Sequence, residues 1–158
     1  MVSEGTNQVQ GAYTKVIACA TVIEAVERTP MINSISGGLQ WLEVIRRVMK
    51  AAHSSGVPDR NVYLNPLAMT LAYNTDSALT TLDVVRAIRQ GFPDAHLTLG
   101  LSNISFGLLA RSYINRVFLT SALGSSLDSA ILDRLDHEMK IALVAAEVAL
   151  GHDQHCLN

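Results

Sequence analysis

The sequence predicts an α/β fold built from about four parallel βα units, and three observations support this prediction. Four short apolar runs each end at an Asn or Asp, and a stretch with helical periodicity follows each run. Such alternation is typical of a parallel sheet whose faces are both covered. Charged residues make up only 16% of the 158 residues and apolar residues 49%, as buried strands require. The four runs are Pro30–Asn33, Val62–Asn65, Leu97–Asn103 and Ala130–Asp133.

The first part of the chain is predicted to hold two helices around one strand. Residues Val16–Arg28 carry an apolar face at helical spacing, and strand Met31–Ile35 follows them. Apolar residues then recur every three or four positions over Leu39–Ala52, which predicts an amphipathic helix with Trp41 at a helix seam or on the exterior. Residues 1–14 are polar and are expected to be poorly ordered. No linker divides the chain, so we expect one domain over its whole length.

Three further strand–helix pairs follow. Strand Val62–Asn65 leads to a helix that Thr75 or Asp76 is expected to cap. Strand Leu97–Leu101 leads through a loop to a second helix, and strand Ser129–Leu132 leads to a third that begins at Asp136. The expected buried stripes of these helices are Leu79, Leu82, Val85 and Ile88, then Ile114, Val117, Phe118 and Ala122, then Met139, Leu143, Ala146 and Leu150.

Composition excludes several classes of protein. The net charge is −2 without a basic cluster, so no nucleic-acid or anionic membrane partner is expected. The apolar runs are too short to span a bilayer. The N-terminal stretch carries Glu4 and lacks the basic character of a signal peptide. Cys19 and Cys156 show no pairing pattern, which favours reduced thiols in a cytoplasmic protein.

Polar residues close the four predicted strands. Ligands of parallel α/β sheets and barrels bind at the carboxyl ends of the strands. A buried polar group at such an end is costly without a partner, so its recurrence suggests that a ligand is the partner. Four units are half of a closed (βα) barrel, which has eight. The chain is therefore half a barrel completed by another copy, an open sheet, or an incomplete gene product.

Four motifs in order carry a family resemblance over about Glu24 to Cys156. They are Met31–Ser36, Tyr63–Leu67, Gly100–Gly107 followed by Arg111–Arg116, and Leu127–Asp133. Together they resemble the methyltetrahydrofolate:corrinoid methyltransferases, pterin-binding barrels similar to dihydropteroate synthase and to the folate domain of cobalamin-dependent methionine synthase. The resemblance implies a partial TIM-type (βα) barrel whose strands match the fourth, sixth, seventh and eighth of the family.

The resemblance also implies an activity. The family moves the N5 methyl group of methyltetrahydrofolate to the cobalt of a corrinoid on a partner protein, so methyltetrahydrofolate is the expected substrate and cobalamin belongs to the partner. The residue that matches the family's catalytic amide is Asn103, which would hydrogen-bond N5 as the carbon–nitrogen bond breaks. The structural alternative is an Asn that caps the loop after a strand. A further expected partner is a second copy that completes the barrel.

By the same resemblance Asn33, Asn65, Ser102 and Arg111 are expected to bind substrate. Asn65 departs from the family, which has Asp there to accept the paired N–H groups of the pterin. Arg111 has the alternative of a surface pair with Asp136. Asp133 is a possible site residue, although the favoured alternative is a structural one, in which an Asp in a βα loop caps a helix.

The sequence is also compatible with other functions. The chain is alternatively a catalytically silent pterin-binding paralogue or fragment, or a dihydropteroate synthase-like enzyme, although no basic phosphate-binding loop is found near the last strands. The tail His152–Cys156 has a spacing that a metal site can use, but it follows Gly151 at the chain end, so no metal is expected.

Overall fold

The computed structural model describes residues 37–133 and 135–153. The expected helix Val16–Arg28, the expected strand Met31–Ile35 and the substrate residue Asn33 lie outside these ranges, as does the end of the His152–Cys156 tail. The described elements, in chain order, are α2 (Gly37–Ser54), η2 (Asp59–Asn61), β1 (Tyr63–Leu64), α3 (Ser77–Gly91), β2 (His96–Gly100), η3 (Leu101–Ser105), α4 (Arg111–Leu123), β3 (Ser129–Ile131) and α5 (His137–Ala149).

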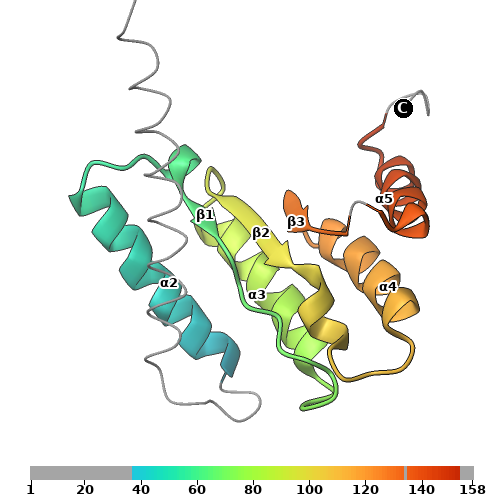
Figure 1. Ribbon diagram of the computed structural model, residues 1–158. Coiled ribbons are helices and arrows are strands. Elements are labelled where there is room, and N and C mark those ends of the chain that lie inside the picture. Colours follow the sequence, from blue (N-terminus) through green and yellow to red (C-terminus); the bar gives the residue numbers. More distant parts are fainter. Residues whose placement is uncertain (1–36, 134, 154–158) are drawn as a thin grey trace, which may run out of the picture.

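The described strands form one parallel sheet in the order β1-β2-β3. Tyr63 pairs with His96 at one edge of β2, and Thr98 pairs with Ser129 at the other. Figure 1 shows the three strands side by side with α3 behind them. The predicted α/β class and parallel strand order are therefore confirmed. Within the described residues the outer edges of β1 and β3 have no strand beside them, so a closed barrel is not observed.

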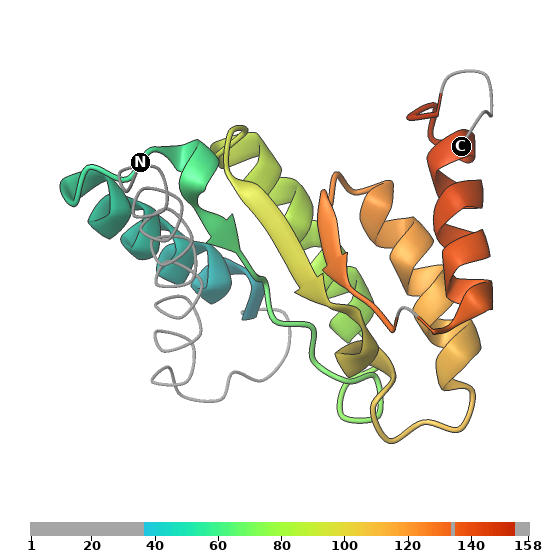
Figure 2. The same cartoon turned by 45° about the horizontal axis from the view of Figure 1, so that its top comes forward.

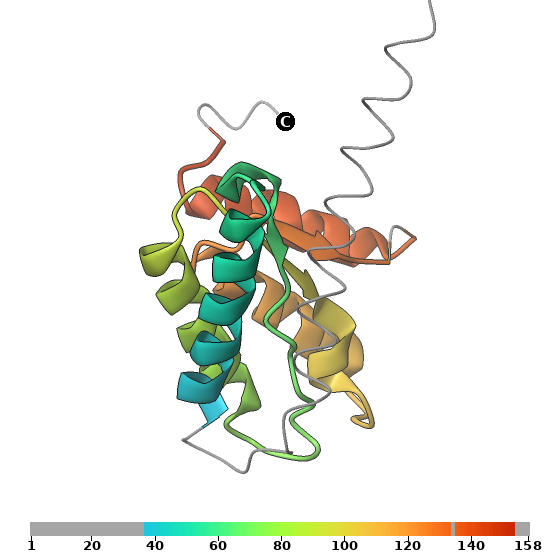
Figure 3. The same cartoon turned by 90° about the vertical axis from the view of Figure 1, so that its left-hand side faces the viewer.

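The core lies between the sheet and the helices that pack on it. Leu97 and Leu99 of β2 are fully buried and alternate with half-buried residues, as expected when one face of a strand is covered. Helices α2 and α3 lie side by side on the same side of β1, as Figure 3 shows. Burying a Leu or Ile side chain stabilises a fold by about 1.5–3 kcal/mol. The largest fully buried side chains are Ile45, Met49, Leu64, Ile88, Leu97, Leu99, Leu101, Ile104 and Leu119.

An arginine–aspartate pair closes the amino-terminal side of the sheet. The Arg89 guanidinium contacts the Asp128 carboxylate at 2.6 Å and donates to the carbonyl oxygens of Ala95 and Ser126 at 2.9 and 3.1 Å. The other Asp128 oxygen accepts the backbone N–H of Leu97 at 2.9 Å. The two loops that lead into β2 and β3 are therefore fixed to each other at the end of the sheet opposite the predicted site.

The helix caps follow the predictions only in part. Asp136 caps α5, because its carboxylate accepts the backbone N–H of Met139 at 3.0 Å. Asp76 occupies the cap position of α3, but its side chain makes no cap hydrogen bond. The Asn74 side chain instead accepts the backbone N–H of Asp76 at 2.9 Å, so it is Asn74 that closes the turn before this helix.

Three residues that were predicted to lie in the buried helix stripes are exposed, so these predictions are wrong. Leu79 of α3 is 65% exposed, Val117 of α4 is 69% exposed, and Leu150, which follows the end of α5, is 38% exposed. Thr81 and Val84 of α3 and Leu119 of α4 are buried in their place. Leu79 lies about 60° around the helix from buried Leu82, and Val117 lies about 100° from buried Phe118, so a modest error in the phase of the period moves either residue to solvent. Among the described helices, none is long and apolar enough to cross a membrane.

Candidate functional site

The sequence-predicted polar residues gather at the carboxyl edge of the sheet. Asn65 directly follows β1, Ser102 and Asn103 lie in η3 directly after β2, and Asp133 lies two residues after β3. Since the three strands are parallel neighbours, their carboxyl ends meet at one edge. Figure 2 shows the chain leaving β1, β2 and β3 at this edge. The edge is the position at which ligands bind parallel α/β sheets.

Asn65 carries a buried acceptor that is not satisfied. Its Oδ1 atom is buried and has no hydrogen-bond partner, although the residue as a whole is half-buried. An unsatisfied buried polar atom costs about 1–3 kcal/mol, so native folds seldom keep one without a reason. A ligand that brings an N–H group to this atom would remove the cost.

Asn103 presents its amide to solvent above the end of β2. The residue is exposed, and its Nδ2 atom lies 3.5 Å from the point where a Cβ atom on Gly100 would stand. Within the described residues the Asn103 amide makes no hydrogen bond. Leu101 and Ile104 on either side of it are buried and anchor the turn. The amide is thus held at the edge by its backbone and remains free to bind a ligand as donor or acceptor.

The loop after β1 holds the turn that carries Asn103. The backbone N–H of Leu71 donates to the carbonyl oxygen of Ile104 at 2.9 Å. The Thr70 hydroxyl donates to the carbonyl oxygen of Phe106 at 2.5 Å. The segments that follow Asn65 and Asn103 are therefore joined by two hydrogen bonds, which fixes the separation of the two strand ends.

Arg111 contacts the same turn from α4. Its Nε donates to the Ser105 hydroxyl at 3.2 Å, and one terminal nitrogen donates to the carbonyl oxygen of Ser102 at 3.3 Å. The alternative of a pair with Asp136 is wrong, because the Arg111 guanidinium is directed to Ser102 and Ser105 and forms no ion pair with Asp136. Of the predicted residues, Ser102 and Arg111 are the two that a direct hydrogen bond brings together.

Asp133 has a local partner. Its Oδ1 atom accepts the backbone N–H of Leu135 at 2.9 Å, and its side chain is exposed. An Asp that bonds the backbone two residues ahead closes a turn. Asp133 therefore makes a local structural contact, as expected, but it closes a turn, and the helix cap belongs to Asp136.

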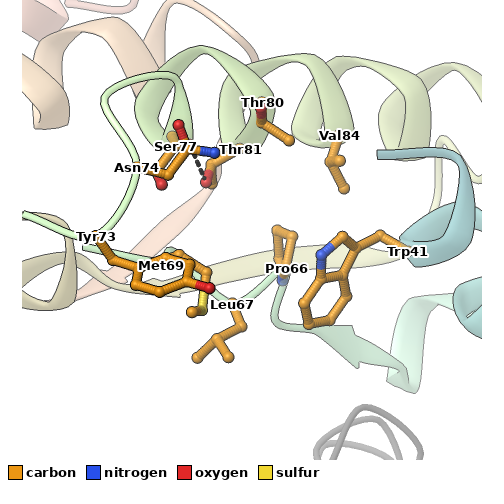
Figure 4. Close-up of a pocket in the computed structure, with 10 residues that line it drawn as sticks. All are labelled: Trp41, Pro66, Leu67, Met69, Tyr73, Asn74, Ser77, Thr80, Thr81 and Val84. Atoms are coloured by element: carbon orange, nitrogen blue, oxygen red, sulfur yellow. Dashed lines mark hydrogen bonds between the residues drawn. The ribbon is translucent and has the colours of Figure 1, made fainter. Parts of the chain in front are cut away.

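A small cavity lies between α2, the loop after β1 and α3, and Pro66, the residue after Asn65, forms part of its wall. In Figure 4 the Trp41 ring stands next to Pro66, while Tyr73 and Met69 lie along the other end of the wall. The expectation that Trp41 lies at a helix seam or on the exterior did not indicate this cavity, and no sequence pattern marked Tyr73. The lining residues are Trp41, Pro66, Leu67, Met69, Tyr73, Asn74, Ser77, Thr80, Thr81 and Val84.

Within residues 37–133 and 135–153, no three His, Cys, Asp or Glu side chains are grouped as a metal site requires.

The relatives that match the chain include three named enzymes. A methylcorrinoid:tetrahydrofolate methyltransferase of Eubacterium limosum is 33% identical over 115 residues, which are 73% of this chain and 42% of that protein. Methionine synthase of Mycobacterium tuberculosis is 37% identical over 116 residues, 70% of this chain and 8% of that enzyme. The chain belongs to the methyltetrahydrofolate:corrinoid methyltransferase family.

Membership rests on part of each relative. Methionine synthase of Mycobacterium leprae is 36% identical over 98 residues, which cover 58% of this chain and again 8% of that enzyme. The chain thus spans less than half the length of the Eubacterium methyltransferase and less than a tenth of the methionine synthases. Within the methyltetrahydrofolate:corrinoid methyltransferase family the chain therefore corresponds to a segment of the longer relatives. No family model matches the chain.

Proposed function

We propose that the carboxyl edge of the sheet binds the pterin of methyltetrahydrofolate and serves transfer of its N5 methyl group to the cobalt of a corrinoid protein. The observation that carries the proposal is the buried, unpartnered Oδ1 of Asn65 next to the turn that bears Asn103. A pterin edge offers N–H groups that such an acceptor binds. The activities for which the relatives are named favour this pterin over other ligands.

Asn103 is the proposed catalytic residue. When the carbon–nitrogen bond breaks, its electron pair stays on N5, and N5 must gain a proton or a strong hydrogen bond. The exposed Asn103 amide supplies a neutral donor whose hydrogen bond strengthens as charge develops on N5. A group of this kind accelerates the reaction because it binds the transition state more tightly than the ground state.

The remaining residues position the substrate and the turn. Asn65 accepts one pterin N–H at Oδ1, while its amide nitrogen offers a donor where the family has a second acceptor. Ser102 and Arg111 act together, since the Arg111 guanidinium fixes the carbonyl of Ser102 next to Asn103. Asn33 remains a predicted substrate residue outside the described ranges. Asp133 is assigned a structural role, because its Oδ1 atom accepts the backbone N–H of Leu135 and closes a turn.

The proposed partners follow from the same chemistry. A corrinoid protein brings cobalamin to the edge. A second copy of this chain that completes the barrel remains a prediction, as does a cytoplasmic location. The second candidate function is pterin binding without transfer, and it is favoured by the short match to each relative.

Two measurements on the purified chain separate these functions. Calorimetry with tetrahydrofolate measures binding, and a labelled methyl group with a Co(I) corrinoid measures transfer. Binding together with transfer supports the proposed reaction, and binding alone assigns the chain to a silent paralogue. An Asn61→Ala variant is the matched control, because Asn61 lies before β1 at the opposite edge of the sheet. Absence of tetrahydrofolate binding would overturn the proposal.

A further inference from the structure

Ser105 is a fully buried serine close to the carboxyl edge of the sheet. It ends η3 and follows Ile104, which is also fully buried. Burying a hydroxyl group costs free energy, and its hydrogen bonds do little more than offset that cost. An alanine would occupy nearly the same space without this cost, so packing alone does not account for the hydroxyl group.

The Ser105 hydroxyl both donates and accepts a hydrogen bond. It donates to the carbonyl oxygen of Ser102 at 3.2 Å and accepts from Nε of Arg111 at 3.2 Å. Nη2 of Arg111 donates to the same carbonyl oxygen at 3.3 Å. The three residues therefore form a closed ring of hydrogen bonds, in which Ser105 is buried whereas Ser102 and Arg111 are exposed.

This ring fixes the backbone next to Asn103. The carbonyl oxygen of Ser102 belongs to the planar peptide unit that leads into Asn103, so the two donors that hold this oxygen set the orientation of the plane. The next peptide unit is held as well, because the carbonyl oxygen of Asn103 accepts the backbone N–H of Phe106 at 3.2 Å. The Asn103 side chain thus extends from a backbone that is fixed on both sides.

The same ring orients the guanidinium group of Arg111. Nε and Nη2 lie along one edge of this planar group, and the turn occupies that edge. Both acceptors are uncharged, and no ion pair in the described part of the chain includes Arg111. The positive charge and the N–H groups of Nη1 therefore remain available to a ligand.

We infer that Ser105 is a positioning residue that holds the Arg111 guanidinium in the orientation in which it binds the substrate. Because Ser105 is fully buried, it acts through Arg111 and the Ser102 carbonyl and does not touch the substrate itself. The inference rests on the proposed function, since the substrate is the pterin proposed above.

Calorimetry of the full chain with tetrahydrofolate tests this role. Ser105→Ala should weaken binding about tenfold, because the hydrogen bond that orients a charged group is lost. In an Arg111→Ala background the same substitution should change the affinity by less than about twofold, since Ser105 then has no guanidinium to hold.

Ser125→Ala is the matched control. Ser125 is also buried, and its hydroxyl donates to the carbonyl oxygen of Ser121 at 2.9 Å. It precedes β3, at the opposite edge of the sheet from the proposed site. This variant loses a comparable hydrogen bond and should keep the native affinity for tetrahydrofolate.

Nitrogen-15 NMR measures the restraint on Arg111 directly, and Arg111→Ala identifies its Nε–H signal. In the native chain this proton should exchange with water more slowly than the Nε–H of exposed Arg47. In Ser105→Ala its exchange should become about tenfold faster, because its acceptor is gone. A serine that only fills space would leave this exchange rate unchanged.

The outcomes separate the inference from the proposed function. An Arg111 signal that exchanges as fast as that of Arg47 in the native chain would overturn the inference, and this measurement does not require the variant to fold. Equal losses of affinity from Ser105→Ala with and without Arg111 would overturn it too, as would no loss at all, while the proposed function would stand. A native chain that does not bind tetrahydrofolate would overturn both.

Discussion

The backbone N–H of Leu71 donates to the carbonyl oxygen of Ile104 at 2.9 Å, across two loops that follow neighbouring strands. Ile104 is fully buried next to Asn103, whereas Leu71 lies in the segment that starts at Asn65. The bond therefore couples the two strand ends on which the proposed site depends. It also explains why an exposed Asn103 keeps a defined backbone position.

Thr70 supports the same connection through its side chain. Its hydroxyl bonds the Phe106 carbonyl and accepts the backbone N–H of Ala72 at 3.2 Å. Thr70→Val keeps the shape and removes both bonds, so the free energy of unfolding should fall by about 1–2 kcal/mol. Urea denaturation measures the change. Thr70→Ser should keep most of the stability, and Thr80→Val, on the cavity wall, should have a smaller effect. Equal stability of Thr70→Val and the native chain would mean that this hydroxyl does not hold the loops.

Two aspartates at helix starts provide a direct comparison. Asp136→Ala removes a real cap bond and should lower the free energy of unfolding by about 1 kcal/mol. Asp76→Ala changes the same residue type at the same helix position, but no cap bond is lost, so a smaller effect is expected. Thermal denaturation of both variants checks the difference. Equal losses would show that helix dipole effects outweigh the cap bond.

Periodicity and turn chemistry predicted most of the described fold. The strands around Leu64, Leu97 and Ala130 and the cap at Asp136 were found from apolar runs and one capping residue. The wrong positions, Leu79, Val117 and Leu150, are apolar residues near the border of a helix face or at a helix end, where only packing decides which side chains are buried. The contact between Arg89 and Asp128 was not predicted from the sequence, because 39 residues separate the two side chains along the chain.

The contact between Arg89 and Asp128 is expected to raise the free energy of unfolding. Asp128→Ala removes the contact with Arg89 and leaves the Leu97 N–H without its acceptor. Both side chains are partly exposed, so solvent screening reduces the loss, and we expect about 1–2 kcal/mol. Asp94→Ala, an exposed carboxylate in the loop that precedes β2, is the control and should change little. Urea denaturation in which both variants match the native chain would contradict a stabilising role for the pair.

Asn65→Asp should alter stability and affinity in opposite directions. Without ligand, a carboxylate in place of the unpartnered Oδ1 has no donor to bind, so the unliganded protein should lose about 1–3 kcal/mol. With a pterin, two acceptors match the paired N–H groups, so affinity should rise by up to about tenfold, or 1.4 kcal/mol. Thermal denaturation and calorimetry measure the two effects, with Asn61→Asp as control. Equal or weaker affinity would remove Asn65 from the pterin contacts.

The sequence predicts which edge of the sheet carries the candidate site, but it does not predict which side chains contact one another there. Parallel strands bring Asn65 and Asn103 to the same edge, and a sequence pattern is sufficient for that inference. The direction of the Arg111 side chain was not predictable, because a long side chain chooses among several acceptors. It binds the turn through Ser102 and Ser105 rather than Asp136. Burial of the Asn65 oxygen depends on packing between elements distant in sequence.

Asn103→Ala tests the proposed chemistry most directly. The substitution leaves the buried anchors Leu101 and Ile104 in place and removes an exposed amide without a hydrogen-bond partner in the described residues, so the thermal midpoint should move little. Loss of one preorganised donor lowers the chemical step by about 10²–10³. Methyl transfer to a Co(I) corrinoid should therefore fall by this factor in a preparation whose native chain is active, whereas tetrahydrofolate binding should change far less. Asn61→Ala, which removes an amide at the opposite edge, should retain the native rate. A variant that keeps most of its rate while its thermal midpoint falls would identify Asn103 as a structural cap of η3 and exclude it from the reaction.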